Sequence, residues 1–289
     1  MSLVSSAAAG LGAAACFGTA STLQHHAARE SPQITGTAKK QTRVLVRVIS
    51  QPAWIAGAIA DFAGIALQAV ALSLGPLSFV QPMLVTGLLF ALVASAIFAR
   101  RAVSVSEVVW AATLTASLAI FLELSQPDTG SGHTSLVAEA IVGLVVVVSV
   151  LAGVMSIRHA SPIRQGVTLG ALTGALYGVG AALMKVVVHE AQHGVVHAIV
   201  SLPLLALLAV GAVGFYLNQR AFQAGQLRVS LPAITAVDPV VSIVIGIALL
   251  NERLHGGAGA HLFQGAALVC LLLATTKLSV LKERKAQLS

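Results

Sequence analysis

Long apolar runs, separated by short polar segments, cover most of the 289 residues of the chain. The runs extend for about 20 residues each, the length that an α-helix needs to cross the hydrocarbon layer of a bilayer. Apolar positions follow one another without alternation, so the pattern predicts helices and not barrel strands. The nine predicted spans are about Leu3–Leu23, Pro52–Leu74, Leu77–Ala99, Val103–Leu124, Leu136–Ile157, Val167–Val188, Leu202–Ala224, Val229–Leu250 and Gly259–Leu281.

Composition agrees with this pattern. The chain is 57% hydrophobic and 9% charged, whereas a soluble domain has about 25% charged residues. We therefore interpret it as an all-α, polytopic membrane bundle. Cys16 and Cys270 lie inside apolar runs and indicate no disulfide framework. The sequence contains no nucleotide-binding loop, catalytic triad or metal-hydrolase motif, so it predicts neither an enzyme nor a cofactor.

The basic residues follow the loops in a regular way. With nine spans and the N-terminus outside, 15 of the 17 Lys and Arg residues fall on the cytoplasmic side, and Lys185 and Arg253 remain outside. The positive-inside rule thus accounts for the net charge of +7 without a nucleic-acid partner. We expect a multi-pass protein of the cell inner (cytoplasmic) membrane, with the C-terminus in the cytoplasm and the bilayer as a partner.

Part of the sequence occurs twice. Seven positions of residues 64–82 match residues 214–232 at a constant offset of 150, and four positions of the first span match the sixth span at an offset of 160. The matched pairs are Gly64/Gly214, Leu67/Leu217, Gln68/Asn218, Ala71/Ala221, Gly75/Gly225, Leu77/Leu227 and Pro82/Pro232, and then Gly10/Gly170, Phe17/Tyr177, Gly18/Gly178 and Leu23/Leu183. Duplicated apolar hairpins are typical of secondary transporters.

The duplication also predicts how the two copies are oriented. The repeat period is five spans, an odd number, so the copies should cross the membrane in opposite directions as an inverted 4+5 repeat. The first repeat is then 1–125, with four spans and a long basic cytoplasmic loop at 24–51. The second repeat is 135–281, with five spans, and 282–289 forms a cytoplasmic tail.

Two carboxylates lie deep in predicted spans, Asp61 in the second and Asp238 in the eighth. Both are about nine residues from the cytoplasmic end, or roughly 13 Å at ~1.5 Å per residue. A carboxylate at that depth is costly and marks a functional candidate. No Lys or Arg is predicted nearby, which favours a cation or a proton. A Mg²⁺ ion held by Asp61 and Asp238 fits, because Mg²⁺ needs few protein ligands. A proton relay fits equally, and Asp238 alternatively accepts backbone hydrogen bonds at a helix break before Pro239.

Four further polar residues belong to the predicted solute pathway: Gln68, Asn218, Gln81 and Tyr177. Gln68 and Asn218 occupy equivalent repeat positions, where they either line two alternating vestibules or join helices by hydrogen bonds. Glu123, Glu139 and Lys185 gather at the outer ends of spans, as an outer vestibule or as solvated rim charges and a Glu–Lys pair.

Two other patterns have both a functional and a structural interpretation. His189, Glu190, His193 and His197 have the spacing of a metal site if the helix continues through them, and are otherwise solvated loop residues. Gly166, Gly170, Gly174 and Gly178 form one smooth helix face, suited to a sliding surface or to plain close packing.

Two motifs resemble a known family. The segment Pro232…Asp238-Pro-Val-Val-Ser-Ile-Val-Ile-Gly-Ile-Ala-Leu-Leu-Asn-Glu-Arg-Leu, followed by Gln264-Gly-Ala-Ala-Leu, resembles the C-terminal helices of the drug/metabolite transporter (EamA-like) superfamily. Trp54…Gly64…Ala71-Leu-Ser-Leu-Gly-Pro-Leu-Ser-Phe-Val-Gln-Pro is similar to the NIPA-type magnesium transporters and their bacterial relatives. The resemblance implies a polytopic carrier of small solutes, and the long basic first loop departs from the compact members.

The leading hypothesis is a secondary transporter that moves a small solute by alternating access between inverted repeats, with a divalent cation such as Mg²⁺ as one candidate. A proton-coupled exporter of a small metabolite or lipid-linked precursor is the first alternative. A non-transporting membrane scaffold or accessory subunit is the second. The expected partners are an ion or small molecule and the bilayer, and a homodimer is compatible with each hypothesis.

Overall fold

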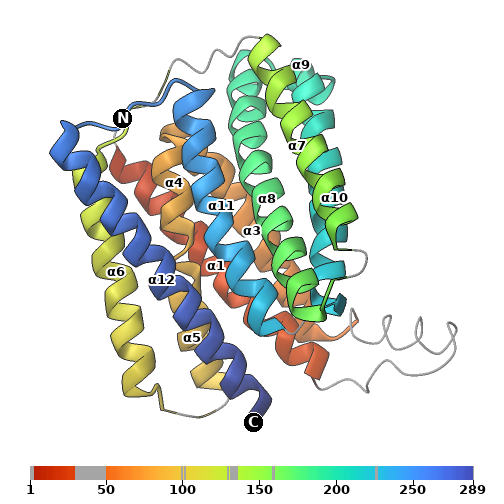
Figure 1. Ribbon diagram of the computed structural model, residues 1–289, viewed down its shortest axis with the longest axis vertical. Helices are drawn as coiled ribbons and strands as arrows, with labels where there is room; N and C mark the ends of the chain where they lie inside the picture. Colours follow the sequence, from red (N-terminus) through yellow and green to blue (C-terminus); the bar gives the residue numbers. More distant parts are fainter. Residues whose placement is uncertain are drawn as a thin grey trace, which may run out of the picture.

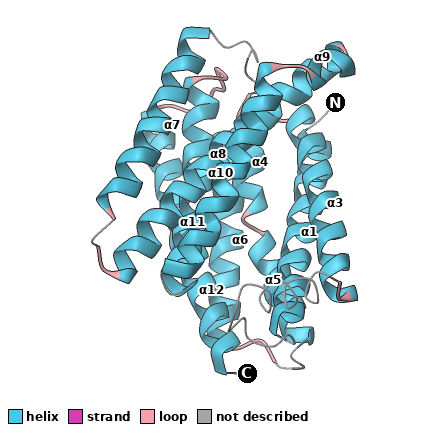
Figure 2. Cartoon of the chain, turned by 90° about the vertical axis from the view of Figure 1, so that its right-hand side faces the viewer, coloured by secondary structure: helices cyan, strands magenta, loops and turns pink. Residues whose placement is uncertain are grey.

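The computed structural model describes residues 3–29, 50–98, 100, 102–128, 130, 136–157, 160–224 and 227–288. In these ranges the regular structure is entirely helical (Figure 2). The helices are α1 (Leu3–Arg29), α3 (Pro52–Leu74), α4 (Leu77–Leu84), α5 (Gly87–Phe98), α6 (Val105–Ser125), α7 (Leu136–Ser156), α8 (Pro162–His193), α9 (Val195–Ile199), α10 (Leu202–Ala224), α11 (Leu227–Ala248) and α12 (Ala258–Leu288).

The sequence pattern locates most helices well. The predicted bounds of α3 and α10 are confirmed to the residue, while α8 and α12 are longer than the apolar runs that predicted them. Eight helical segments of the described chain are long and apolar enough to cross a membrane, with α4 and α5 counted together. In α7, the apolar part found is shorter, 143–156. The chain is therefore an integral membrane protein with multiple apolar helices.

The third predicted span is wrong in one respect, because the structure divides it into α4 and α5. Pro82 cannot donate a backbone hydrogen bond and disturbs the helix around it. Just after it, Val85 N donates to Pro82 O at 3.3 Å and Thr86 N donates to Met83 O at 3.0 Å. These bonds span three residues instead of four, so the chain tightens into a turn before α5 begins at Gly87.

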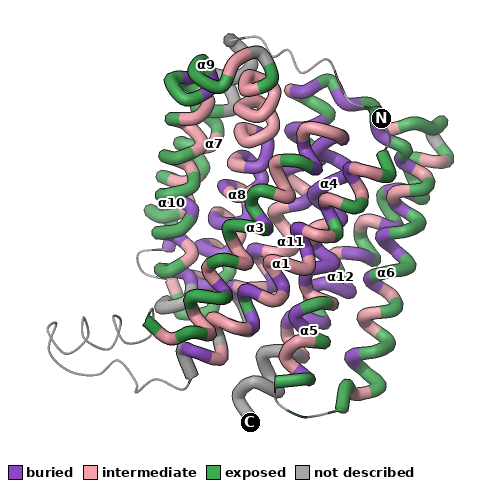
Figure 3. The backbone as a smooth tube through the Cα atoms, turned by 180° about the vertical axis from the view of Figure 1, so that it is seen from behind, coloured by how far each residue is buried: buried purple, intermediate pink, exposed green. Residues whose placement is uncertain are grey.

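Large apolar side chains cover the outward faces of the bundle, as membrane-spanning helices require. Phe62, Leu144 and Leu205 are examples on α3, α7 and α10. Buried residues concentrate where α4, α8 and α11 meet, whereas exposed ones run along the outer helices (Figure 3). This is the distribution expected when lipid, and not water, surrounds the bundle.

Helix partners repeat between the two halves of the chain. α1 packs against α3 and α5, and α8 packs in the same way against α10 and α11. α6 packs against α12. The ends of the chain lie at opposite ends of the bundle (Figure 1), which we call the N-terminal and C-terminal ends. The predicted loop 24–51 lies mainly outside the described residues, and the membrane orientation stays a prediction.

An aromatic ring over a glycine occurs in both halves. A Cβ added to Gly64 would lie 2.7 Å from the Phe17 ring, and one added to Gly214 would lie 3.2 Å from the Tyr177 ring. These are the positions that the sequence offsets of 150 and 160 pair with one another. A Cβ at Gly64 would overlap the Phe17 ring, and a Cβ at Gly214 would require the Tyr177 ring to move slightly.

Gly18 tests this close packing. A Cβ there would lie 2.9 Å from both Ala91 N and Phe90 Cβ on α5. We expect Gly18→Ala to lower the unfolding midpoint in detergent, because overpacking costs about 1–3 kcal/mol. Gly265→Ala is the matched control, since a Cβ at Gly265 has no neighbour within 4 Å. The control should be neutral or stabilising by up to ~1 kcal/mol from helix propensity. Equal midpoints for both variants would contradict the packing argument.

Candidate functional site

A cavity of about 700 Å³ lies between α1, α3, α4 and α5 on one side and α8, α10 and α11 on the other. Most residues that line it are apolar. Its polar lining residues are Ser21, Asp61, Gln68, Gln81, Tyr177, Thr235 and Asp238. Five of the six predicted pathway residues are therefore brought to one cavity, and Asn218 lies beside it.

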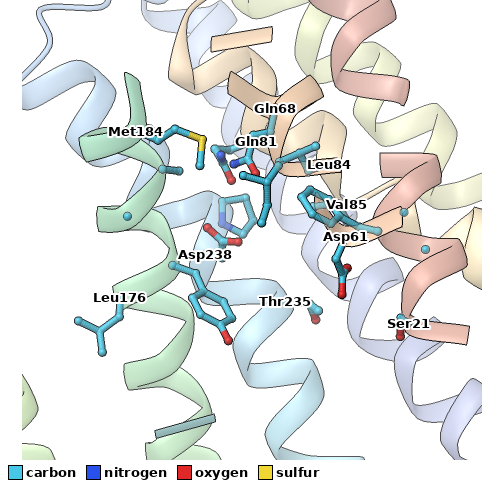
Figure 4. A pocket seen from close by; sticks show the side chains of 18 of the residues that line it. Ser21, Asp61, Gln68, Gln81, Leu84, Val85, Leu176, Met184, Thr235 and Asp238 are labelled. Atoms are coloured by element: carbon cyan, nitrogen blue, oxygen red, sulfur yellow. The ribbon is translucent and has the colours of Figure 1, made fainter. Parts of the chain in front are cut away.

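The two predicted carboxylates face this cavity from different helices. Asp61 of α3 and Asp238 of α11 lie on opposite sides of it (Figure 4). Gln24 Nε2 of α1 donates to Asp61 Oδ2 at 2.6 Å. Ser242 Oγ donates to Asp238 Oδ1 at a longer 3.3 Å. The sequence therefore located both acids, but not their partners.

The alternative interpretation of Asp238, a helix break before Pro239, is wrong. α11 continues through Pro239 to Ala248. The hydrogen bond to Asp238 comes from a side chain one turn later in the same helix. Asp238 thus lies in an intact helix and lines an open cavity.

A complete metal site is not assembled in the described part of the chain. No group of three or more His, Cys, Asp or Glu side chains there could hold a metal ion. The proposed His189–His197 helix face is interrupted, because α8 ends at His193 and Gly194 has φ +154 before α9 begins. The His193 side chain lies outside the described set. The pair Asp61 and Asp238 remains a prediction as magnesium ligands.

Amide groups occupy one end of the cavity. Gln68 and Gln81 lie close together beside Met184 (Figure 4). Gln81 is 2% exposed, and its Nε2 has no hydrogen-bond partner among the described residues. Asn218 is within hydrogen-bonding reach of Tyr177, while its own Oδ1 finds no partner in the same part of the chain. Such groups are costly to bury unless something binds to them.

Residues that the sequence repeat pairs with one another line the cavity from both halves of the chain. Seven lining positions of the first half have their equivalents, at the same offsets of 150 or 160, among the lining positions of the second half. The pairs are Phe17/Tyr177, Ser21/Ala181, Asp61/Gly211, Ile65/Phe215, Gln81/Leu231, Val85/Thr235 and Leu88/Asp238. Equivalent surfaces of the two halves therefore face each other across the cavity, with different side chains.

Glu252 and Lys185 form a buried ion pair at the N-terminal end of the bundle. Lys185 Nζ lies 2.6 Å from Glu252 Oε1 and donates to Gly75 O at 3.2 Å. Glu252 also accepts from the first backbone groups of α4, Leu77 N at 2.6 Å and Ser78 N at 2.9 Å. Ser78 Oγ donates to Glu252 Oε2 at 2.7 Å. We call these four residues, Ser78, Lys185, Glu252 and Gly75, the end clamp.

The end clamp closes the cavity beyond Met184. Directly beneath it, buried residues of α3, α4, α8 and α11 form one apolar cluster, which includes Leu77, Val80, Ala182 and Ile245. At the C-terminal end, by contrast, the described parts of α1 and α5 do not pack extensively against α8 or α11. Among the helices that line the cavity, the described contacts between the two halves therefore concentrate at its N-terminal end, while α12 of the second half packs separately against α6.

The structure describes two of the three side chains of the predicted outer vestibule, those of Glu123 and Lys185. Glu123 is exposed, and the Glu139 side chain lies outside the described set. Lys185 belongs to the end clamp, where its acid is Glu252, a residue outside the predicted vestibule group. The sequence pattern did not lead us to pair Glu252 with Lys185. A signal for this pair was available in the sequence. Glu252 directly follows an apolar span, and Lys185 lies at the same predicted depth in another span.

Removing the acid of the end clamp should destabilise the fold. Glu252→Ala leaves Lys185 buried without its anion and α4 without its cap, and losing one member of a buried pair costs about 3–5 kcal/mol. Glu123→Ala, an exposed glutamate, is the control and should change stability by less than ~0.5 kcal/mol. Thermal unfolding in detergent measures both. An unchanged midpoint for Glu252→Ala would show that the ion pair contributes nothing.

Comparison with known proteins identifies one relationship. No protein-family model and no solved structure matches the chain, so the resemblance to drug/metabolite and NIPA-type transporters stays a prediction. The chain is 32% identical over 237 residues to the uncharacterized protein Cgl0250/cg0304 of Corynebacterium glutamicum. The aligned part covers 81% of this chain and 82% of that protein. The chain therefore belongs to the same protein family as this uncharacterized Corynebacterium glutamicum protein.

Proposed function

We propose that the protein is a secondary transporter that moves a small solute across the cell membrane by alternating access. The observation that carries this proposal is the central cavity, which equivalent positions of both halves line and which a clamp closes at one end. A scaffold has no need of such a cavity inside its bundle. A carrier needs one that can open toward each side in turn.

The recurring helix contacts in the two halves, together with the predicted inverted repeat, support the proposed motion. The helix pairing of α1 with α3 and α5 recurs as α8 with α10 and α11, and the aromatic contact on Gly64 recurs on Gly214. Two halves of similar shape can exchange their arrangements, so that the closed end becomes the open one. The close glycine contacts lie within each half, which would let each half move as a unit.

The end clamp supports a gate at the closed end. It joins α4 of the first half to α8 and the α11–α12 connection of the second half. Opening this end would separate Lys185 and Glu252 from each other or from the start of α4. With the predicted topology, the clamp faces the outside and the cavity faces the cytoplasm in this conformation.

The charge of the cavity supports a positively charged cargo or a coupled proton. Asp61 and Asp238 line it, and none of its described lining residues is Lys, Arg or His. An anion would be repelled by two carboxylates. Proton-coupled export and cation transport both agree with this charge, because a carboxylate can bind either.

Cysteine labelling tests alternating access without knowledge of the cargo. In a variant lacking Cys16 and Cys270, we expect Met184→Cys to react with a membrane-impermeant maleimide from the C-terminal side of sealed vesicles only. Adding Glu252→Gln should raise labelling from the N-terminal side by about tenfold or more, because losing ~1.4 kcal/mol of clamp energy shifts a population tenfold.

Two control positions show how a residue accessible to water and a residue facing lipid behave in the same labelling experiment. Val196→Cys, exposed on α9 near the clamp, should react from the N-terminal side in both backgrounds. Val147→Cys, on the outward face of α7, should remain unlabelled in lipid. Absence of Met184→Cys labelling from either side would reject a solvated cavity and favour the scaffold alternative.

A further inference from the structure

The chemistry of the cavity wall indicates the class of molecule that the cavity binds. We propose that it binds an organic amine that carries a protonated nitrogen, a hydrogen-bond acceptor and an apolar body. This inference rests on the proposed transporter function, since it names the cargo of the same cavity. Asp238 would hold the nitrogen, and Gln81 Nε2 would donate to the acceptor.

The charged end of the ligand follows from Asp238. Its single described hydrogen bond is the 3.3 Å contact from Ser242, which leaves the second carboxylate oxygen available. Asp61 also accepts one hydrogen bond, but this bond, from Gln24, is shorter at 2.6 Å, so the charge of Asp61 is better satisfied. Lys185 is the cation nearest in sequence to the lining, one residue after Met184, but Glu252 and Gly75 occupy it. A protonated amine would supply the charge that the described wall does not provide.

The acceptor follows from Gln81, which is independent of the acids. Its side chain is buried and lines the cavity, and its Nε2 has no partner in the part of the chain that the structure describes. In Figure 4 it lies at the cavity end shared with Gln68 and Met184, away from Thr235. A buried amide donor without a partner is costly, and a carbonyl or hydroxyl oxygen of the ligand would satisfy it.

The apolar body follows from the size and lining of the cavity. A volume of about 700 Å³ lies within the ~300–1,000 Å³ range of pockets for organic ligands. Phe17, Tyr177 and Phe215 present aromatic surface to it. A Mg²⁺ ion keeps several of its waters and would need only the carboxylates, so it would leave this aromatic surface without a partner.

Three compounds with the same phenyl body test the proposal. Phenylalaninamide has both the amine and the acceptor, 2-phenylethylamine lacks the acceptor, and 3-phenylpropionamide lacks the amine. Equilibrium dialysis with the full-length protein in detergent gives each Kd, and MgCl₂ is added as a competitor. We expect phenylalaninamide to bind most tightly, and removal of its amine to weaken binding by about tenfold or more, as for a charge-assisted hydrogen bond.

Two variants assign the groups. Asp238→Asn should abolish the preference for phenylalaninamide over 3-phenylpropionamide, and Gln81→Leu should abolish its preference over 2-phenylethylamine. Asp128→Asn, an exposed acid in the α6–α7 connection, is the matched control and should keep both preferences. If Asp238→Asn does not fold, the three compounds on the unmodified protein still decide whether the site selects a cation.

The remaining outcomes overturn the proposal. Equal binding of the amine and the neutral amide would mean that the carboxylates bind protons only. Displacement by Mg²⁺ at equal or higher affinity, or binding of none of the three compounds, would exclude an amine site. The labelling experiment is separate, so a protein that alternates without binding these amines is still a transporter with another cargo. One that binds them without alternating is a receptor or scaffold.

Discussion

The carboxylate of Glu252 lies where α4 begins, and there the first backbone N–H groups of a helix have no partner within the helix. Pro76 precedes this helix and supplies no side-chain cap, so the cap comes from a residue 175 positions away in sequence. In a low-dielectric interior, such a group must be satisfied or the helix start is lost. Glu252 satisfies it and also neutralises Lys185 of α8. One side chain thus connects both halves of the chain at the end where the cavity closes.

The interruption between α4 and α5 depends on the same arrangement. α4 is short and has Pro82 in it, so its position relies on contacts at its start as much as on its own hydrogen bonds. Val85, in the interruption, and Gly87, which begins α5, line the cavity. Broken helices inside a membrane occur where they border a cavity. The clamp at the start of α4 and the cavity beside its end are therefore mechanically linked through one eight-residue helix.

Hydrophobic length predicted most of the fold, because each span must satisfy its own backbone and be apolar outside. It could not predict the turn at Val85 and Thr86, since Pro82 alone is tolerated in many membrane helices. Counting residues from the span ends identified Asp61 and Asp238, because a carboxylate so deep in a membrane span is costly and therefore rare. Depth alone did not identify Gln24 as the partner of Asp61, because the two residues meet only through the packing of α1 against α3. It placed Lys185 and Glu252 at the same level but did not show that α8 brings them into contact.

Equivalent positions of the two halves carry different side chains in the cavity wall, and this difference gives the cavity a direction. Asp61 corresponds to Gly211, Asp238 to Leu88, and Gln81 to Leu231, and all six positions face the cavity. Only one member of each pair is polar, so a pseudo-symmetric chamber has an asymmetric interior. In the proposed carrier, a bound molecule would have one preferred orientation, because turning it end for end would pair its charge with leucine or glycine. The helices would then present similar surfaces to both sides of the membrane, while the polar groups would always meet the same end of the molecule.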